Sequence, residues 1–191
     1  MSNFKRLEQD SMGTIEVPKE ALWGAQTQRS ILNFAIGDEK IPLEIIYAIA
    51  KIKTSAAKVN HQLGIIDAET TSLITEASSE IVKGKHDNQF PLKIWQTGSG
   101  TQTNMNLNEV ISNYANKLST GKIGTKKPVH PNDHVNASQS SNDSFPTAMH
   151  ISSVIQIQRK LIPSIKEMIS VLQKKTKEFK KIIKIGRTHM Q

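Results

Sequence analysis

The most informative part of the chain reads Trp95-Gln96-Thr97-Gly98-Ser99-Gly100-Thr101-Gln102-Thr103-Asn104-Met105-Asn106-Leu107-Asn108-Glu109. It combines two glycines with many hydroxyl and amide side chains, and it contains one acid and no basic residue. An apolar helical pattern follows at once, so the glycines open a helix, whose N-terminal N–H groups and dipole favour an anion. The stretch therefore suits a small anion such as a carboxylate, held by neutral donors. The alternative is a polar turn with an N-cap, because the same residue types are common in loops.

Composition excludes several classes of protein. The chain has 191 residues, of which 37% are hydrophobic and 22% charged, and this is typical of a water-soluble globular domain. No apolar run is long enough to span a membrane, and the first residues lack the apolar segment of a secretory signal. The absence of cysteine excludes disulfides, thiol nucleophiles and Cys-ligated zinc. We therefore expect a cytoplasmic protein that does not bind a membrane.

The net charge of +8 is concentrated late in the chain. The basic run consists of Lys174, Lys175, Lys177, Lys180, Lys181 and Lys184. A contact with nucleic acid is one interpretation of such a run. However, Phe179 is its only aromatic residue, and lysines spaced along an amphipathic helix usually form a solvated face. We therefore expect no nucleic-acid partner.

Apolar periodicity predicts a mainly helical chain. Helices are expected at about 19–33, 42–63 and 68–83, and a fourth carries the apolar pattern from Met105 to Leu118 and ends near Gly121. Asp67 is expected to cap the third of them, and Gly64 is placed to end the second. Gly24 weakens the first helix, and the chain before residue 18 reads as extended or irregular.

The last part of the sequence reads as one long helix. Residues 121–142 form a long polar loop, after which apolar residues recur from Met149 to Phe179, with Asp143 as a candidate N-cap and Pro163 as a kink. A helix of this length suggests a bundle helix whose partners lie elsewhere. Because the chain ends soon afterwards, we expect the front piece of a larger protein, divided into domains 1–141 and 142–191.

Three separated polar stretches together resemble a known family. They are 98–108, 130–143 and 186–191. In this order they are similar to the class II fumarate hydratases of the aspartase/fumarase superfamily. Residues 10–13, 22–30 and 90–101 resemble the same family, so the similarity covers essentially the whole chain.

The resemblance implies both a fold and a reaction. The fold is mainly α, with the N-terminal helical domain of the superfamily followed by the first long helix of its central helical bundle. The reaction is that of a hydro-lyase of the tricarboxylic acid cycle, the reversible hydration of fumarate to L-malate, with no metal or organic cofactor. The family is a homotetramer whose sites combine three subunits, so the resemblance implies a homo-oligomer.

The resemblance also assigns site residues. It assigns substrate binding to Ser99, Thr101, Ser140, Ser141, Asn142 and Thr188, and activation of water to His189. It assigns a second anion site to Lys127, His130, Asn132 and Asp133. The family has arginine where Lys127 stands, and lysine cannot provide arginine's planar two-pronged donor. A metal at His130 and His134 is an alternative, but their spacing matches no strong metal motif.

Other functions stay open at this point. In the family, a serine loop that supplies the carbon base, and a glutamate that assists the histidine, lie beyond the residues of this chain. The 191 residues alone are therefore expected to be inactive. The alternatives are an ammonia-lyase acting on aspartate, in whose relatives glutamine typically replaces His189, and a truncated, non-catalytic helical interaction module. A basic polyanion binder is a further alternative.

Overall fold

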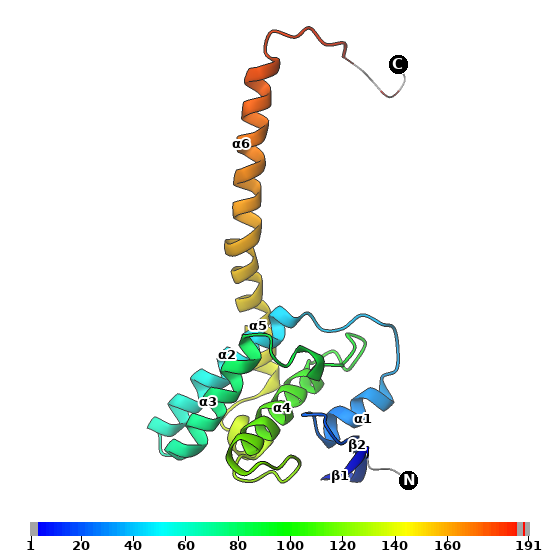
Figure 1. Ribbon diagram of the computed structural model, residues 1–191, viewed down its shortest axis with the longest axis vertical. Coiled ribbons are helices and arrows are strands. Elements are labelled where there is room, and N and C mark those ends of the chain that lie inside the picture. The colour runs from blue at the N-terminus through cyan, green and yellow to red at the C-terminus, as the bar shows by residue number, and fades with distance from the viewer. Residues whose placement is uncertain (1–3, 187–188, 190–191) are drawn as a thin grey trace. The chain divides into compact units, whose positions relative to one another are not determined.

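The computed structural model describes residues 4–186 and 189, and it is mainly helical with one small sheet (Figure 1). The chain divides into two units, Met1–Ser152 and Ser153–Gln191. The helical fold class expected from the sequence is confirmed. The domain boundary expected at residue 141 stays a prediction.

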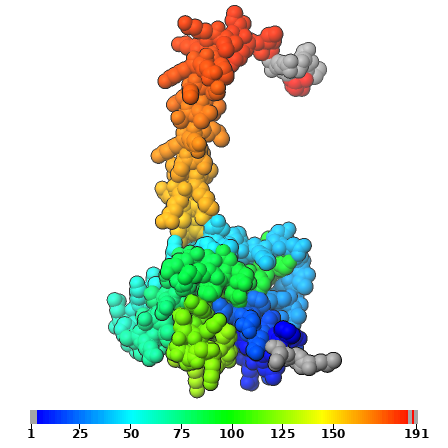
Figure 2. All heavy atoms as spheres, viewed as in Figure 1, coloured from blue at the N-terminus to red at the C-terminus, as the bar shows by residue number. Residues whose placement is uncertain are grey.

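The first unit begins with a β-hairpin. Strand β1 (Lys5–Asp10) pairs antiparallel with β2 (Gly13–Pro18), so that Lys5 lies opposite Pro18 and Asp10 opposite Gly13. The loop around residues 121–130 lies beside this hairpin on the surface of the unit (Figure 2), where Lys126 Nζ donates a hydrogen bond to the carbonyl oxygen of Gln9. The extended start of the chain is thus a two-stranded sheet fixed by a distant loop.

Helix α1 is shorter than the sequence predicted. It spans Ala25–Asn33 instead of beginning near residue 19. The reason is Arg6, whose guanidinium donates hydrogen bonds of 2.7–2.9 Å to carbonyl oxygens of Pro18, Lys19, Ala21 and Trp23. Carbonyl groups that converge on one guanidinium cannot all point along a helix axis toward the next turn. The predicted start of this helix was therefore wrong, and its predicted end at Asn33 is confirmed.

The core of the first unit lies between three long helices. They are α2 (Leu43–Gln62), α3 (Ala68–Val82) and α4 (Thr101–Thr120), which pack beside one another (Figure 1). Their fully buried apolar side chains include Ile46, Ile49, Ile74, Ile81, Leu107, Val110 and Ile111. Asp67 caps α3 as predicted, because its Oδ1 accepts the N–H of Thr70 at 2.6 Å. A short 3₁₀ helix, η1 (Asp87–Gln89), lies in the loop between α3 and α4.

The loop after α4 leads into the last helix of the first unit. It contains a short π-helix, η2 (Pro131–Val135), and is followed by α5 (Ser141–Gln156). Asp143 lies within the first turn of α5, so its prediction as the N-cap was wrong. Ser140 takes that role, because its Oγ accepts the N–H of Asn142 at 3.2 Å.

The second unit is helical and its described apolar side chains are largely exposed. It holds the end of α5, the π-helical residues η3 (Ile157–Leu161) and α6 (Ile162–Phe179). The π-helical stretch ends two residues before Pro163, whose ring nitrogen cannot donate to the carbonyl one turn earlier. Among the described residues, no helix is long and apolar enough to cross a membrane.

Candidate active site

The first polar stretch forms the N-terminus of α4. Gly100 precedes the helix with a φ of 71°, a left-handed conformation that glycine adopts without steric cost. Gln96 Oε1 accepts the N–H and the hydroxyl of Thr103, both at 3.1 Å, and so caps the third N–H of the helix. Within residues 4–186 and 189, the N–H groups of Thr101 and Gln102 meet no hydrogen-bond acceptor. These two donors, at the positive end of the helix dipole, remain available to an anion.

The second polar stretch brings the start of α5 against the start of α4. Thr101 Oγ1 lies 3.2 Å from Ser141 Oγ, and Ser99 Oγ lies 3.0 Å from Thr101 Oγ1. We call these three side chains the hydroxyl cluster. The two helices meet closely because Gly100 has no side chain, and a Cβ atom at that position would lie 2.3 Å from the ring of Phe145. Two helix N-termini and three hydroxyl groups therefore share one region, although they lie about 40 residues apart in sequence.

Ser140 and Asn142 flank Ser141, one member of the hydroxyl cluster, in sequence. Both are exposed, and the Ser140 hydroxyl serves as the cap of α5. Substrate contact by either side chain stays a prediction.

The third polar stretch is only partly described. Thr188 lies outside the described residues. His189 is described as an exposed residue in a turn of the second unit. Its role as the base that activates water stays a prediction.

Several amide side chains of α4 hold loops. Asn106 Nδ2 donates to the carbonyl oxygen of Gln89 at 3.1 Å. Asn116 exchanges two hydrogen bonds with the backbone of Val129, with its Nδ2 donating at 2.9 Å and its Oδ1 accepting at 2.8 Å. These side chains are buried, so α4 fixes the loops that contain Gln89 and Val129.

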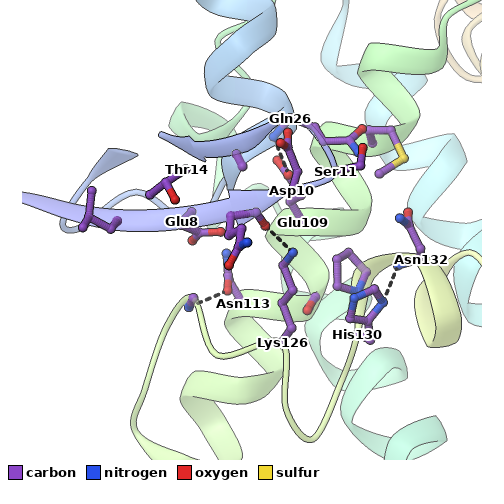
Figure 3. A pocket seen from close by; sticks show the side chains of 17 residues that line it. Glu8, Asp10, Ser11, Thr14, Gln26, Glu109, Asn113, Lys126, His130 and Asn132 are labelled. Carbon is purple, nitrogen blue, oxygen red and sulfur yellow. Dashed lines mark hydrogen bonds between the residues drawn. The ribbon is translucent and has the colours of Figure 1, made fainter. Parts of the chain in front are cut away.

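A cavity of about 680 Å³ lies beside the N-terminal hairpin (Figure 3). It is lined by β1, β2, α1, α4 and the loop 124–132, and it includes His130 and Asn132 from the predicted second anion site. The basic residue that lines it is Lys126, whereas the side chain of the neighbouring Lys127 is not part of the lining and the residue is exposed.

His130 is held in one orientation at this cavity. Its Nδ1 accepts the backbone N–H groups of Asn132 at 3.2 Å and Asp133 at 3.1 Å, and burial lowers its pKa. Both effects favour the neutral ring with its proton on Nε2. Asp133 Oδ2 lies 3.3 Å from the same Nδ1, but a nitrogen that already accepts two amide protons does not also donate to that carboxylate. His130 can therefore offer one neutral Nε2–H donor to a ligand.

Three carboxylates also line this cavity, and each has partners. Glu8 pairs with Arg6 at 2.6 Å, and Asp10 pairs with Arg29 at 2.9 Å. The hydrogen bond from Arg29 lowers the pKa of Asp10. Burial raises the pKa of Glu109, and hydrogen bonds from the N-terminus of α1 oppose this effect. Nearby carboxylates disfavour an anion here except close to Lys126 and His130.

Metal binding has no support among the described residues. Within residues 4–186 and 189, no group of three or more His, Asp or Glu side chains is placed to hold a metal ion. In particular, His134 Nδ1 accepts the backbone N–H of His130 at 2.9 Å, so that nitrogen is occupied by the turn.

Sequence reasoning missed residues that shape the site without standing in its motifs. Lys126 lines the cavity, and Lys53 is fully buried on α2. In the sequence, Lys126 stands out only by its position beside Lys127. The sequence cannot show which of these two adjacent lysines lines the cavity. For Lys53 the signal was its place on the apolar face of a helix, three residues before Ala56 and four before Ala57.

These features define a helical domain in which neutral donors from two helix N-termini meet. The family profile described as "Lyase" matches residues 13–191. The chain belongs to this lyase family.

Two curated relatives of the chain carry the same printed name. This chain is 61% identical over 189 residues to "Fumarate hydratase class II" of Prochlorococcus marinus subsp. pastoris, and the match covers 99% of this chain and 41% of that protein. It is 54% identical over 190 residues to "Fumarate hydratase class II" of Thermosynechococcus vestitus, covering 100% of this chain and 41% of that protein. The chain thus spans about two fifths of the length of these curated relatives.

Solved structures agree with this family. The recombinant class II fumarase from Schistosoma mansoni is 51% identical with a TM-score of 0.91, and the match covers 98% of this chain and 40% of that one. The fumarate lyase:delta crystallin from Brucella melitensis is 36% identical with a TM-score of 0.93, covering 98% of this chain and 44% of that one.

Proposed function

We propose that this chain supplies part of the active site of a fumarate hydratase, which adds water reversibly to fumarate to give L-malate. The observation that carries the proposal is the 3.2 Å approach of Thr101 Oγ1 to Ser141 Oγ at two adjoining helix N-termini. The shared name of the relatives supports it, and so does their identity of 54% or more. The region offers donors without a fixed positive charge, which suits a carboxylate that must enter and leave.

The chemistry requires such donors. When L-malate is dehydrated to fumarate, a base removes a proton from the carbon beside a carboxylate. The electron pair moves into that carboxylate, which becomes a dianionic aci form. The carbon–oxygen bond then breaks, and the hydroxyl leaves as water after receiving a proton. Donors fixed around the carboxylate oxygens stabilise the aci form more than the ground state. We assign this role to the hydroxyl cluster, with the N–H groups of Thr101 and Gln102, Ser140, Asn142 and Thr188.

We assign the proton exchange with water to His189. A neutral imidazole has one ring nitrogen that can accept a proton from attacking water and return it to the departing hydroxyl. The carbon base and the group that assists the histidine are assigned by resemblance to residues beyond this chain, and in the family three subunits share each site. We therefore propose a homotetramer, located in the cytoplasm, as the active form.

We also propose a second anion site at His130, Asn132 and Asp133. Its basic residue is either Lys127, as the resemblance implies, or Lys126, which lines the cavity with His130. The neutral Nε2–H of His130 favours a weakly held anion.

The direct test is hydration of fumarate by the protein expressed from its complete coding sequence. Loss of the ultraviolet absorbance of fumarate is followed for the wild type, Thr101→Val and His189→Asn. We expect turnover by the wild type and a loss of roughly 10²–10³-fold in kcat for Thr101→Val, by analogy with the removal of one oxyanion donor. We expect His189→Asn to lower kcat greatly while thermal unfolding stays unchanged.

Matched controls separate site effects from general effects. Thr120→Val removes a hydroxyl from the opposite end of α4, and His61→Asn makes the histidine substitution at an exposed position on α2. Both should retain wild-type turnover. A wild type that releases ammonia from aspartate and does not hydrate fumarate would identify the ammonia-lyase alternative and refute our proposal.

A further inference from the structure

Lys53 stands out because its side chain is fully buried on α2, where Ile49 and Ala57, one turn away on either side, are also buried. Its Nζ donates a hydrogen bond of 2.8 Å to Oδ1 of Asn136. No ion pair joins it to a carboxylate among the described residues, and burial lowers its pKa to about 7. A buried amine without a carboxylate partner is costly, and a hydrophobic residue of similar volume often serves stability equally well. Stability alone therefore does not account for a lysine at this position.

The acceptor of this hydrogen bond is a point where three segments meet. Asn136 Oδ1 also accepts Nδ2 of Asn104 at 3.0 Å and Nδ2 of Asn108 at 3.2 Å, both from α4. Asn136 Nδ2 donates to the carbonyl oxygen of Gln139 at 3.2 Å. One amide side chain thus joins α2, α4 and the segment that leads into α5.

The hydrogen bonds of Asn136 connect to α4 and to the segment just before α5, and the starts of these two helices meet at the hydroxyl cluster. Asn104 belongs to the first turns of α4, and its N–H donates to the carbonyl oxygen of Gly100 at 3.1 Å. On the other side, Gln139 is two residues before Ser141. A shift of Asn136 would therefore change the separation between Thr101 and Ser141. Shifts of about 1 Å in such groups can cost about 100-fold in rate.

We propose that Lys53 is a positioning residue for the candidate active site, which acts through Asn136 to hold the start of α5 against the start of α4. The expected effect of Lys53 on fumarate binding rests on the proposed function. Its expected effect on the structure rests only on the contacts of Lys53 and Asn136. Either protonation state of the amine carries an N–H, so the contact to Asn136 does not require the charge.

The test replaces Lys53 by methionine, which has a similar length and no donor. In the protein expressed from the complete coding sequence, we expect Lys53→Met to keep or raise its thermal unfolding temperature, because a desolvated amine is removed. We expect its KM for fumarate to rise by about tenfold or more, because the carboxylate donors are misplaced. A residue that served stability only would give a lower unfolding temperature and an unchanged KM. The matched control is Lys58→Met, which removes an exposed lysine from the same helix and should change neither quantity.

A double variant tests whether Lys53 acts through Asn136. If it does, Lys53→Met combined with Asn136→Leu should raise KM no further than Asn136→Leu alone, because both changes break the same contact. Additive effects of the two substitutions would contradict the proposed route.

Hydrogen exchange supplies a readout that needs no substrate. We expect Lys53→Met to accelerate exchange of the backbone amides of residues 134–137 by about tenfold, because the segment loses one anchor. If the wild type neither turns over nor binds fumarate, the proposed function fails, and hydrogen exchange still decides the role of Lys53. Unchanged exchange in Lys53→Met, or an unchanged KM in an active enzyme, would overturn the inference.

Discussion

Gly100 is the residue at which sequence and site geometry are most directly linked. Its φ of 71° allows the chain to turn into α4, and its missing side chain allows the ring of Phe145 to approach. The helix N-termini that carry Thr101 and Ser141 meet at this point. A glycine here therefore serves both the backbone conformation and the contact between α4 and α5.

Gly100→Ala should damage both features. The alanine Cβ would lie 2.3 Å from Phe145, and the left-handed backbone disfavours any side chain. We expect a loss of roughly 1–3 kcal/mol in the free energy of unfolding, measured by urea denaturation. Gly98→Ala is the matched control, because a Cβ at Gly98 meets no atom within 4 Å. Equal stabilities of the two variants would contradict this account of Gly100.

Lys53 should give the protein a pH-dependent stability. Burial lowers its pKa in the folded state to about 7, whereas an unfolded lysine titrates near about 10.4. Between these values the unfolded chain binds more protons than the folded chain, so the free energy of unfolding rises with pH. Lys53→Met should remove a slope of up to about 1.4 kcal/mol per pH unit between pH 7 and about 10. Urea denaturation of both proteins at pH 7 and 9 measures it, and identical slopes would show that Lys53 does not titrate in this range.

At the scale of elements, α4 organises the first unit. Its apolar face contributes to the core, and its buried polar side chains hold the loops at Gln89 and Val129. Glu109 of α4 also contacts a different helix, α1. Its carboxylate accepts the backbone N–H groups of Gly24, Gln26 and Thr27 at 2.8–3.1 Å, and it therefore caps the N-terminus of α1. A carboxylate at a helix N-terminus also interacts favourably with the helix dipole.

Glu109→Gln should weaken the attachment of α1. The amide retains one oxygen, but its NH₂ group would face backbone donors, and the negative charge is lost. We expect the free energy of unfolding to fall by about 1.5–3 kcal/mol, the range for hydrogen bonds to charged groups. Urea denaturation is compared with Glu76→Gln, which makes the same change at an exposed position of α3 and should be neutral. A neutral Glu109→Gln would show that the cap contributes little.

The elements that the sequence predicted well have local causes. Helices α2, α3 and α4 follow apolar periodicity, and Asp67 caps α3 through its own neighbours. The start of α1 could not be predicted in this way, because it depends on Arg6, about twenty residues earlier in the chain. The N-cap of α5 was misplaced because Asp143 and Ser140 are both good capping residues, and only the backbone decides between them.

The candidate site likewise has residues that the sequence predicts from local motifs and residues whose placement depends on distant segments. The hydroxyl and amide motifs were visible in the sequence, and the structure places Ser99, Thr101 and Ser141 together. Lys53, Lys126 and Asn136 were not found as site residues, because their importance arises from contacts with distant segments. Motifs thus identify the groups proposed to contact a ligand more readily than the groups proposed to position them.

At the scale of the whole molecule, the proposed function requires more than the described residues. The chain spans about two fifths of its curated relatives, and the family resemblance assigns the carbon base to a region beyond it. We therefore expect the 191 residues expressed alone to show no fumarate hydration in the ultraviolet assay. Turnover by this chain on its own would contradict the proposed sharing of the active site.

The most direct measurement is a crystal structure of the protein from its complete coding sequence with succinate, an unreactive dicarboxylate. We predict one carboxylate within hydrogen-bond distance of Thr101 Oγ1 and Ser141 Oγ, with the imidazole of His189 from some subunit beside the ligand. Succinate bound with no contact to the hydroxyl cluster, in crystals of an active enzyme, would contradict the account.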